Sequence, residues 1–368
     1  GEPATVTHPP RVVHAVSDDG VHFTRVHGSW LEGCEPGLLH EPSTGLFHLV
    51  APGRRLESGD LETWTPADSA FLPPPASINN PSEQPTGECY GVWRWNDWTY
   101  VVGGRTGFWM ARDIRGPFWP GPAGDRPVTR PRWDIYDGAM VPQGVVIHDN
   151  RCLLVGWVVD HWWGGCLVFR ELRQLADGTL ALGWVPELIP SYATPAPIAS
   201  EGGPARFEND EFALDAGAPD GFAAHAFTLP PGDAHLEFNF RPAPGCAAYG
   251  ICLRATADYR GGRELRLDPR AREARWGTPD GGPPPRVDRP RCYAEDFALP
   301  GVENLDAAEV NVRVILRGWI IDVWINGERT ILNRQHAPAG ERLFVFAHSG
   351  SLRFSAPLHA PLLPPAET

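Results

Sequence analysis

Glycine and proline interrupt this sequence along its whole length. Each occurs 40 times among 368 residues, so that together they exceed a fifth of the chain, while 42% of the residues are hydrophobic and 10% are aromatic. A chain this apolar can bury a core, which argues against disorder. Short apolar runs such as LFHLVA (46–51), WTYVVGG (98–104) and CLLVGWVV (152–159) stand between the turn residues. This pattern predicts an all-β protein of short strands joined by tight turns.

Charge and cysteine content argue against several classes of function. The formal net charge is -13 and lysine is absent, which makes nucleic acid a poor partner. The seven cysteines are scattered without a paired CxxC pattern, so no zinc site is indicated, and no signature of another metal or an organic cofactor is present.

Membrane and targeting signals are also lacking in this sequence. No run approaches the roughly 20 apolar residues of a membrane span, and the first ten residues do not resemble a signal peptide. We therefore expect no membrane partner. The expected location is the cytoplasm, or the outside of the cell after removal of a signal.

The first half of the chain repeats a polar turn followed by an aromatic residue. Copies occur at SDDGVHFTR (17–25), SGDLETWTP (58–66) and ARDIRGPFWPG (111–121). Their spacing of roughly 40 to 50 residues is typical of the four-stranded blades of a β-propeller. A polar turn followed by an aromatic residue also arises by chance in a tryptophan-rich β protein.

The sequence pattern changes near Pro190. The run IPSYATPAPIASEGGPA (189–205) has no strand periodicity, and alternating strand patterns follow it. Asn326-Gly327 between two apolar runs predicts a tight hairpin. We therefore predict a propeller-like domain at 1–190, a linker at 191–200 and a β-sandwich at 201–368.

Three segments resemble glycoside hydrolase family 32, the fructan hydrolases and invertases. They are DHWWGGCLVFRELRQLADGTLALGWVPEL (160–188), AMVPQGVVIHDNRCLLVGW (139–157) and IIDVWINGERTILNR (320–334). The resemblance implies a five-bladed β-propeller followed by a jelly-roll or concanavalin-like sandwich. Five blades of about 45 residues need roughly 225 residues, so the propeller expected within 1–190 is a shortened one.

The resemblance also implies catalytic carboxylates. Glu88, in the pair Glu88-Cys89, matches the acid/base of the family. Glu35, in Cys34-Glu35-Pro36, matches its transition-state-stabilising carboxylate, with Glu in place of Asp and Cys in place of Arg. The family's nucleophile is the Asp of a Trp-Met-Asn-Asp-Pro-Asn-Gly motif, for which we identify no counterpart ahead of Glu35.

Four residues are candidates for substrate binding, namely Trp93, Asp137, Trp162 and Trp163. Trp93, Trp162 and Trp163 are aromatic residues of the kind that stack on sugar rings, although tryptophan also fills the contacts between blades. Asp137 lies one residue from the position of a pocket acid in the family. Asp134, Asp160 and His161 are further polar residues near the ends of expected strands.

Two functions follow from the resemblance. The first is a glycoside hydrolase or transglycosidase acting on fructosides or related sugars. The alternative is a scaffold that has lost hydrolysis and either binds carbohydrate or catalyses another reaction. Both imply a small-molecule or oligosaccharide ligand, and neither fixes the oligomeric state. A longer natural chain that carries the nucleophile motif is a third interpretation.

Overall fold

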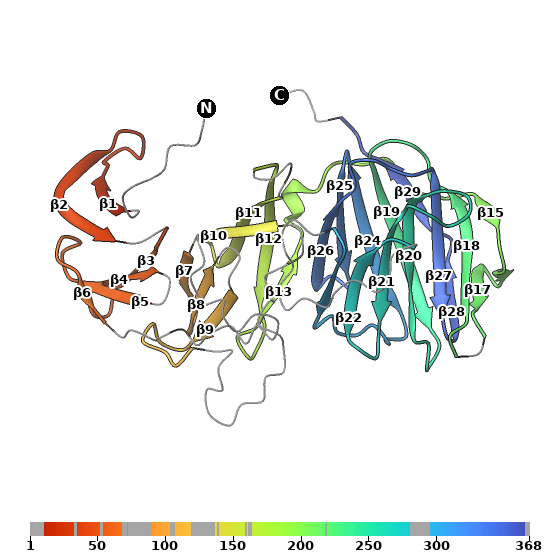
Figure 1. Cartoon of the computed structure of the whole chain (residues 1–368), viewed down its shortest axis with the longest axis horizontal. Coiled ribbons are helices and arrows are strands. Elements are labelled where there is room, and N and C mark those ends of the chain that lie inside the picture. Colours follow the sequence, from red (N-terminus) through yellow and green to blue (C-terminus); the bar gives the residue numbers. More distant parts are fainter. Residues whose placement is uncertain are drawn as a thin grey trace, which may run out of the picture. The chain divides into compact units, whose positions relative to one another are not determined.

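The computed structural model describes residues 11–32, 35–51, 54–67, 72, 90–103, 107–118, 137, 140–158, 160, 164–217, 219–279 and 295–364. Within these ranges the chain is built of β-strands, with one short 3-10 helix, η1 (Pro186–Leu188) (Figure 1). The prediction of an all-β protein is therefore confirmed. Over the same ranges, no helix has the length and apolar character needed to cross a membrane.

The chain forms two compact units. Unit 1 comprises residues 1–133, 141–156 and 176–179, and unit 2 comprises residues 134–140, 157–175 and 180–368. The domain limits expected from the sequence, with a linker at 191–200, stay a prediction. Within that segment β14 (Ala196–Pro197) pairs with β29 (Leu358–Pro361) of unit 2.

Unit 1 contains small antiparallel sheets of consecutive strands, as in the blades of a propeller (Figure 1). A hairpin comes first, formed by β1 (Arg11–Val16) and β2 (Thr24–Glu32). The next sheet consists of β3 (Gly37–Glu41), β4 (Leu46–Ala51), β5 (Arg54–Ser58) and β6 (Thr65–Pro66). The third consists of β7 (Tyr90–Trp95), β8 (Trp98–Gly103) and β9 (Gly107–Ala111).

The repeated turn predicted from the sequence has the same hydrogen bonds in its first two copies. The hydroxyl of Ser17 accepts the N–H of Gly20 at 2.8 Å, and that of Ser58 accepts the N–H of Leu61 at 2.8 Å. In both copies the Asp two residues after the serine accepts two further backbone N–H groups at 2.7 and 2.8 Å. These bonds to the charged form of Asp60 lower the pKa of its carboxyl group to about 2.

A fourth small sheet has the strand order β10-β11-β12-β13. Its strands are β10 (Met140–His148), β11 (Arg151–Val158), β12 (Leu167–Gln174) and β13 (Leu180–Gly183). Alternate side chains of β11 are buried, starting at Cys152, as expected of a strand with one face against a core.

The sandwich of unit 2 contains two large sheets, which Figure 1 shows as neighbouring layers. The strand order in one is β16-β17-β28-β19-β24-β25-β26, with β29 on β19 and β14 on β29. The order in the other is β15-β18-β27-β20-β21-β22-β23.

The strands of the first sheet are β16 (Arg206–Glu208), β17 (Glu211–Asp215), β19 (Ala234–Pro242), β24 (Val310–Arg317), β25 (Ile320–Ile325), β26 (Arg329–Arg334) and β28 (Ser351–Ser355), besides β14 and β29. Those of the second are β15 (Ser200–Gly202), β18 (Phe222–Thr228), β20 (Ala248–Ala255), β21 (Arg263–Asp268), β22 (Glu273–Gly277), β23 (Phe297–Pro300) and β27 (Arg342–His348).

Aromatic side chains join the two layers. The rings of Phe212 on β17 and Phe227 on β18 meet edge to face at 5.3 Å, and those of Phe240 on β19 and Tyr249 on β20 do so at 5.4 Å. Such pairs add to the free energy gained by burying the rings themselves. The predicted two-sheet sandwich is confirmed by this packing.

The hairpin predicted at Asn326-Gly327 is also present. Both residues have positive φ angles, 51° and 67°, and they connect β25 to β26. Asparagine and glycine tolerate this left-handed conformation better than other residues, which is why the dipeptide predicts the turn.

Candidate functional site

Two strands of neighbouring sheets in unit 1, β3 and β7, run side by side. The backbone N–H of Tyr90 at the start of β7 donates to the carbonyl of Glu35, just before β3, at 3.0 Å. At the other end, Nη1 of Arg94 lies 3.8 Å from Oε1 of Glu41. Because both contacts join the strands in the same order, β3 and β7 run in the same direction.

Gly37 permits this close approach. A Cβ atom at position 37 would lie 2.9 Å from the carbonyl oxygen of Tyr90 and 3.0 Å from the nitrogen of Val92. Both are backbone atoms that cannot rotate away. Any larger residue at this position would therefore push the two strands apart.

Glu35 has an unusual backbone conformation. Its φ angle is 45°, in the left-handed region that residues other than glycine, asparagine and aspartate rarely adopt. Its side chain is exposed to solvent. Backbone strain of this kind costs on the order of 1–3 kcal/mol. Leu61, Arg254 and Tyr259 also have positive φ angles, so the conformation does not by itself mark Glu35 as a functional residue.

Several residues predicted for the site lie outside the described residues: Glu88, Trp162 and Trp163, together with Asp134 and His161. Their assignments stay predictions. Asp160 is described and lies in unit 2, where its Oδ1 is 3.3 Å from Nε2 of His336.

Trp93 is a packed residue of β7. It is 4% exposed, and its ring stacks on Tyr100 of β8 with the centroids 5.2 Å apart. Its indole N–H has no hydrogen-bond partner among the described residues. These contacts give Trp93 a place in the core of its sheet, while its assignment to sugar binding stays a prediction.

Asp137 belongs to a buried network in unit 2. Its carboxylate is fully buried, and its Oδ2 accepts a hydrogen bond of 2.6 Å from Nε of Arg170 and one of 3.1 Å from Thr330. Two further bonds, of 2.9 and 2.8 Å, join the same guanidinium to Asp322, which also accepts the indole N–H of Trp184 at 3.1 Å. The network connects β12 to β25 and β26. The assignment of Asp137 to substrate binding stays a prediction.

The electrostatics of this network follow from burial. Burial raises the pKa of the Asp322 carboxyl group, and the charge of Arg170 only partly opposes that rise. Burial acts to lower the pKa of Arg170, but its two carboxylate partners outweigh burial and raise it. Neither Arg170 nor Asp322 is among the site residues predicted from the sequence. An arginine at an inward-facing position of the alternating β12 pattern was the signal that marked the first.

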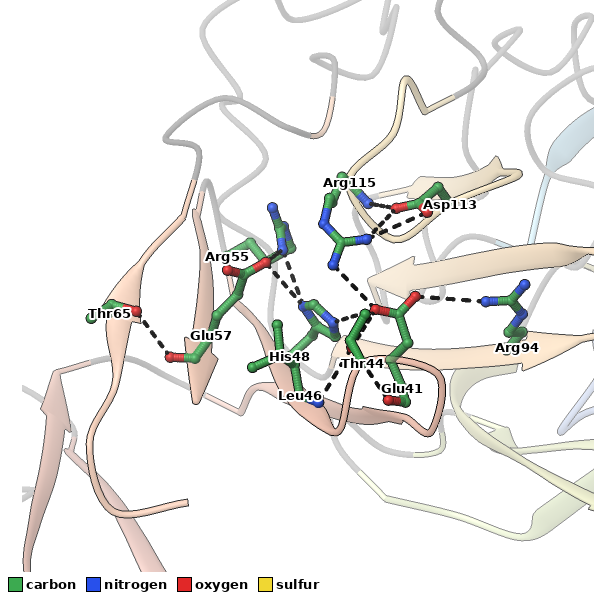
Figure 2. Close-up of polar contacts among 10 residues, drawn as sticks. All are labelled: Glu41, Thr44, Leu46, His48, Arg55, Glu57, Thr65, Arg94, Asp113 and Arg115. Atoms are coloured by element: carbon green, nitrogen blue, oxygen red, sulfur yellow. Dashed lines mark hydrogen bonds and ion pairs between the residues drawn. The ribbon is translucent and has the colours of Figure 1, made fainter. Parts of the chain in front are cut away.

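A second polar cluster, also not predicted from the sequence, surrounds Glu41 in unit 1 (Figure 2). Glu41 is 5% exposed, and its carboxylate accepts hydrogen bonds from Thr44 at 2.8 Å and from Arg115 at 3.2 Å. Its Oε2 lies 3.5 Å from Nε2 of the fully buried His48. Arg55 contacts both His48 and Glu57.

Both titratable groups at the centre of this cluster are shifted. Burial acts to raise the pKa of Glu41, but the hydrogen bond from Thr44 and the charge of Arg115 outweigh it, so the pKa is lowered. Burial, helped by the charge of Arg55, lowers the pKa of His48. Among the described residues, no group of three or more His, Cys, Asp and Glu side chains is arranged to hold a metal ion.

Comparison with known proteins reveals similarity only in structure. No family model and no curated protein matches the sequence. The exo-inulinase of Aspergillus awamori matches with a TM-score of 0.60 at 14% identity, over 95% of this chain and 74% of that one. The GH32 β-fructofuranosidase of Bombyx mori matches with 0.55 at 15%, over 95% and 71%. The sucrose-6-phosphate hydrolase of Lactobacillus gasseri matches with 0.54 at 14%, over 95% and 72%.

At these identities the likeness concerns the fold. It covers both the propeller sheets and the sandwich, in the order that the sequence resemblance implied. The chain therefore has the fold of the glycoside hydrolase family 32 enzymes, in a strongly diverged sequence.

Proposed function

We propose that this protein is a glycoside hydrolase or transglycosidase acting on fructosides or related sugars. In this proposal Glu88 is the acid/base and Glu35 is the carboxylate that stabilises the transition state. The observation that carries the proposal is the hydrogen bond from the N–H of Tyr90 to the carbonyl of Glu35. Glu88 precedes Tyr90 by two residues, and two residues of chain span at most about 7 Å. The described contact therefore joins Glu35 to the residue that directly follows the Glu88-Cys89 pair in the sequence.

Glycoside hydrolysis requires a pair of carboxyl groups. Two carboxyl groups stand on opposite sides of the scissile bond, about 5–5.5 Å apart when the anomeric configuration is retained. In our proposal Glu88 gives its proton to the leaving oxygen as the glycosidic bond breaks. The carboxylate of Glu35 faces the positive charge that develops on the sugar ring.

A retaining reaction also needs a nucleophile. This is a carboxylate that bonds to the anomeric carbon and is released when water, deprotonated by the acid/base, attacks that carbon. Our proposal assigns no residue to this step, because the sequence contains no counterpart of the family's nucleophile motif.

The test is turnover of sucrose and inulin by the full chain, measured as fructose release. Glu88→Gln and Glu35→Gln should each lower kcat by a factor of about 100 to 10,000. Glu62→Gln is the matched control, because Glu62 is an exposed residue of a turn in unit 1. Unchanged turnover in either variant would remove that residue from the mechanism.

A second candidate function is carbohydrate binding without hydrolysis. The observation that favours it is the missing nucleophile motif of the family. Calorimetry that detects binding of inulin, together with no release of fructose, would support this alternative. Efficient hydrolysis would exclude it.

A further inference from the structure

The outer face of the first sandwich sheet carries a row of polar and aromatic side chains. Phe240 of β19 meets Tyr249 of the second sheet, so Glu237 and Asn239, at the alternate positions of β19, lie on the face turned away from the core. The strand register places Arg313 of β24 opposite Glu237, and Trp324 of β25 opposite Arg313. We use the name Arg313 cluster for six residues of this face: His235, Glu237, Asn239, Asn311, Arg313 and Trp324.

Arg313 and Glu237 lie side by side without forming an ion pair. Residues directly opposite each other on antiparallel strands have Cβ atoms about 4.5–5.5 Å apart, which is close enough for an arginine and a glutamate to pair. In the described part of the chain, however, the buried Nε of Arg313 has no hydrogen-bond partner. The nearest charged partner of Glu237 is His235, whose Nδ1 lies 3.6 Å from Oε1. A cation and an anion on neighbouring strands are therefore left to bind something other than each other.

Trp324 lies close to Arg313 but contacts it only loosely. The Cζ atom of Arg313 is 5.8 Å from the centre of the Trp324 ring, whereas Arg112 lies 3.9 Å from the ring of Trp98 in unit 1. Trp324 is partly exposed. Its indole therefore offers an apolar surface directly beside the guanidinium.

His235 adds a buried nitrogen atom to the same face. The residue is 2% exposed, and its ring stacks on Tyr192 with the centroids 4.2 Å apart. Over the described residues Nδ1 has no hydrogen-bond partner, because its distance of 3.6 Å from Glu237 is too long for a hydrogen bond. Burial lowers the pKa of His235, although the charge of Glu237 opposes that change. Buried polar atoms are rarely left without a partner, and a bound ligand is one way of supplying it.

Two amide side chains extend the cluster along β19 and β24. Nδ2 of Asn311 donates to Oδ1 of Asn239 at 2.8 Å. This bond uses one polar group of each amide and leaves the other for a further partner, namely Nδ2 of Asn239 and Oδ1 of Asn311. One donor and one acceptor thus stand beside the two charged side chains.

This combination of groups fits the hydroxyl groups of a sugar. Arginine only donates hydrogen bonds and an ionised carboxylate only accepts them, whereas each sugar hydroxyl does both. The ring of a sugar also packs against an aromatic surface. Glu237 would repel an anion and Arg313 would repel a cation, so a neutral ligand with several hydroxyl groups is favoured.

We propose that the Arg313 cluster binds one sugar unit, with hydroxyl groups between Arg313 and Glu237 and the sugar ring against Trp324. The site is formed by the sandwich of unit 2 alone. Binding there breaks no bond, so the proposal does not depend on the proposed hydrolysis.

The experiment follows the Nε–Hε signal of Arg313 by NMR of the full chain labelled with 15N-arginine. The signal is identified by its loss in Arg313→Lys. D-Fructose, D-glucose and sodium phosphate are titrated separately, and neither sugar contains a glycosidic bond that hydrolysis could break. We expect a saturable shift of the signal with at least one of the two sugars. No saturable shift with either sugar would overturn the proposal, and a shift with phosphate but with neither sugar would do so by showing an anion site.

Two variants test whether the neighbouring residues take part. Glu237→Gln should raise the Kd measured from the Arg313 signal about tenfold, because it removes a charged hydrogen-bond acceptor. Arg317→Gln is the matched control, because Arg317 is an exposed arginine of the same strand, and its Kd should equal that of the wild type. Thermal unfolding checks that both variants are folded, and Asn239→Ala replaces Glu237→Gln if the latter is not.

An unchanged Kd in the folded cluster variant would overturn the assignment of the sugar to this site. Fructose release from sucrose tests the proposed hydrolysis separately. Each of the two proposals can therefore fail while the other stands.

Discussion

Arg170 and Asp137 form a buried ion pair in which Nε donates to Oδ2 at 2.6 Å. The same guanidinium binds Asp322 with two further hydrogen bonds. Three charged side chains therefore share one site in unit 2, where one guanidinium binds two carboxylates. Removing that cation leaves Asp137 and Asp322 without the guanidinium that both of them bind.

The first prediction concerns Arg170→Met. Breaking a buried pair by removing one partner costs about 3–5 kcal/mol, so the free energy of unfolding of unit 2 should fall by that amount. The measurement is chemical denaturation followed by tryptophan fluorescence. Arg173→Met is the control on the same strand, because its pair with Glu328 is 3.6 Å long and exposed, and it should cost less than 1 kcal/mol. Equal costs for the two variants would contradict this account.

The second prediction concerns Gly37→Ala. The added Cβ would collide with backbone atoms of Tyr90 and Val92, so unit 1 should lose about 1–3 kcal/mol of stability and the proposed fructosidase activity should fall with it. Gly59→Ala provides the comparison, because no atom lies within 4 Å of a Cβ built there. Thermal unfolding of both variants checks the difference. A fully stable Gly37→Ala protein would show that the strands can separate freely.

The third prediction separates stability from activity at Glu35. Asparagine tolerates the left-handed conformation better than glutamate, so Glu35→Asn should unfold within about 0.5 kcal/mol of the wild type or be more stable. The same variant should lower kcat on sucrose by a factor of about 100 to 10,000, as Glu35→Gln should, because the carboxylate is gone. Activity retained in Glu35→Asn would exclude Glu35 from the chemistry.

The fourth prediction concerns acid sensitivity of the sandwich. Burial lowers the pKa of His225, whose Nε2 lies 2.8 Å from the hydroxyl of Ser200. The unfolded chain then binds a proton more readily than the folded chain, so this contribution to stability is present above about pH 6.5 and is lost as the pH falls through the lowered folded pKa. Denaturation midpoints of the wild type should decrease from pH 7 to pH 5, and His225→Gln should flatten that slope. Parallel slopes would show that His225 contributes nothing to it.

The features that the sequence predicted correctly depend on neighbours in the chain. The Asn326-Gly327 hairpin and the turns at Ser17 and Ser58 form from residues within a few positions of one another. Local conformational preference and local hydrogen bonding are enough to specify such features.

The features that the sequence did not predict join distant positions. Arg170 reaches Asp137 across 33 residues and Asp322 across 152. The sequence around Arg170 does not indicate which residues it contacts. The contact between Glu35 and Tyr90 uses backbone atoms, which every residue carries, so side-chain chemistry gives no hint of it. Both relationships depend on which strands pack together. The alternating pattern of a strand shows which of its faces is buried, but it does not show which strand lies against that face.

The matching turns at Ser17 and Ser58 bear on how such a chain is assembled. Each turn satisfies its own backbone N–H groups with its own serine and aspartate, and neither needs a partner elsewhere for those bonds. The conformation of each turn is therefore set within a few residues of the chain. It does not depend on which sheet packs beside the turn.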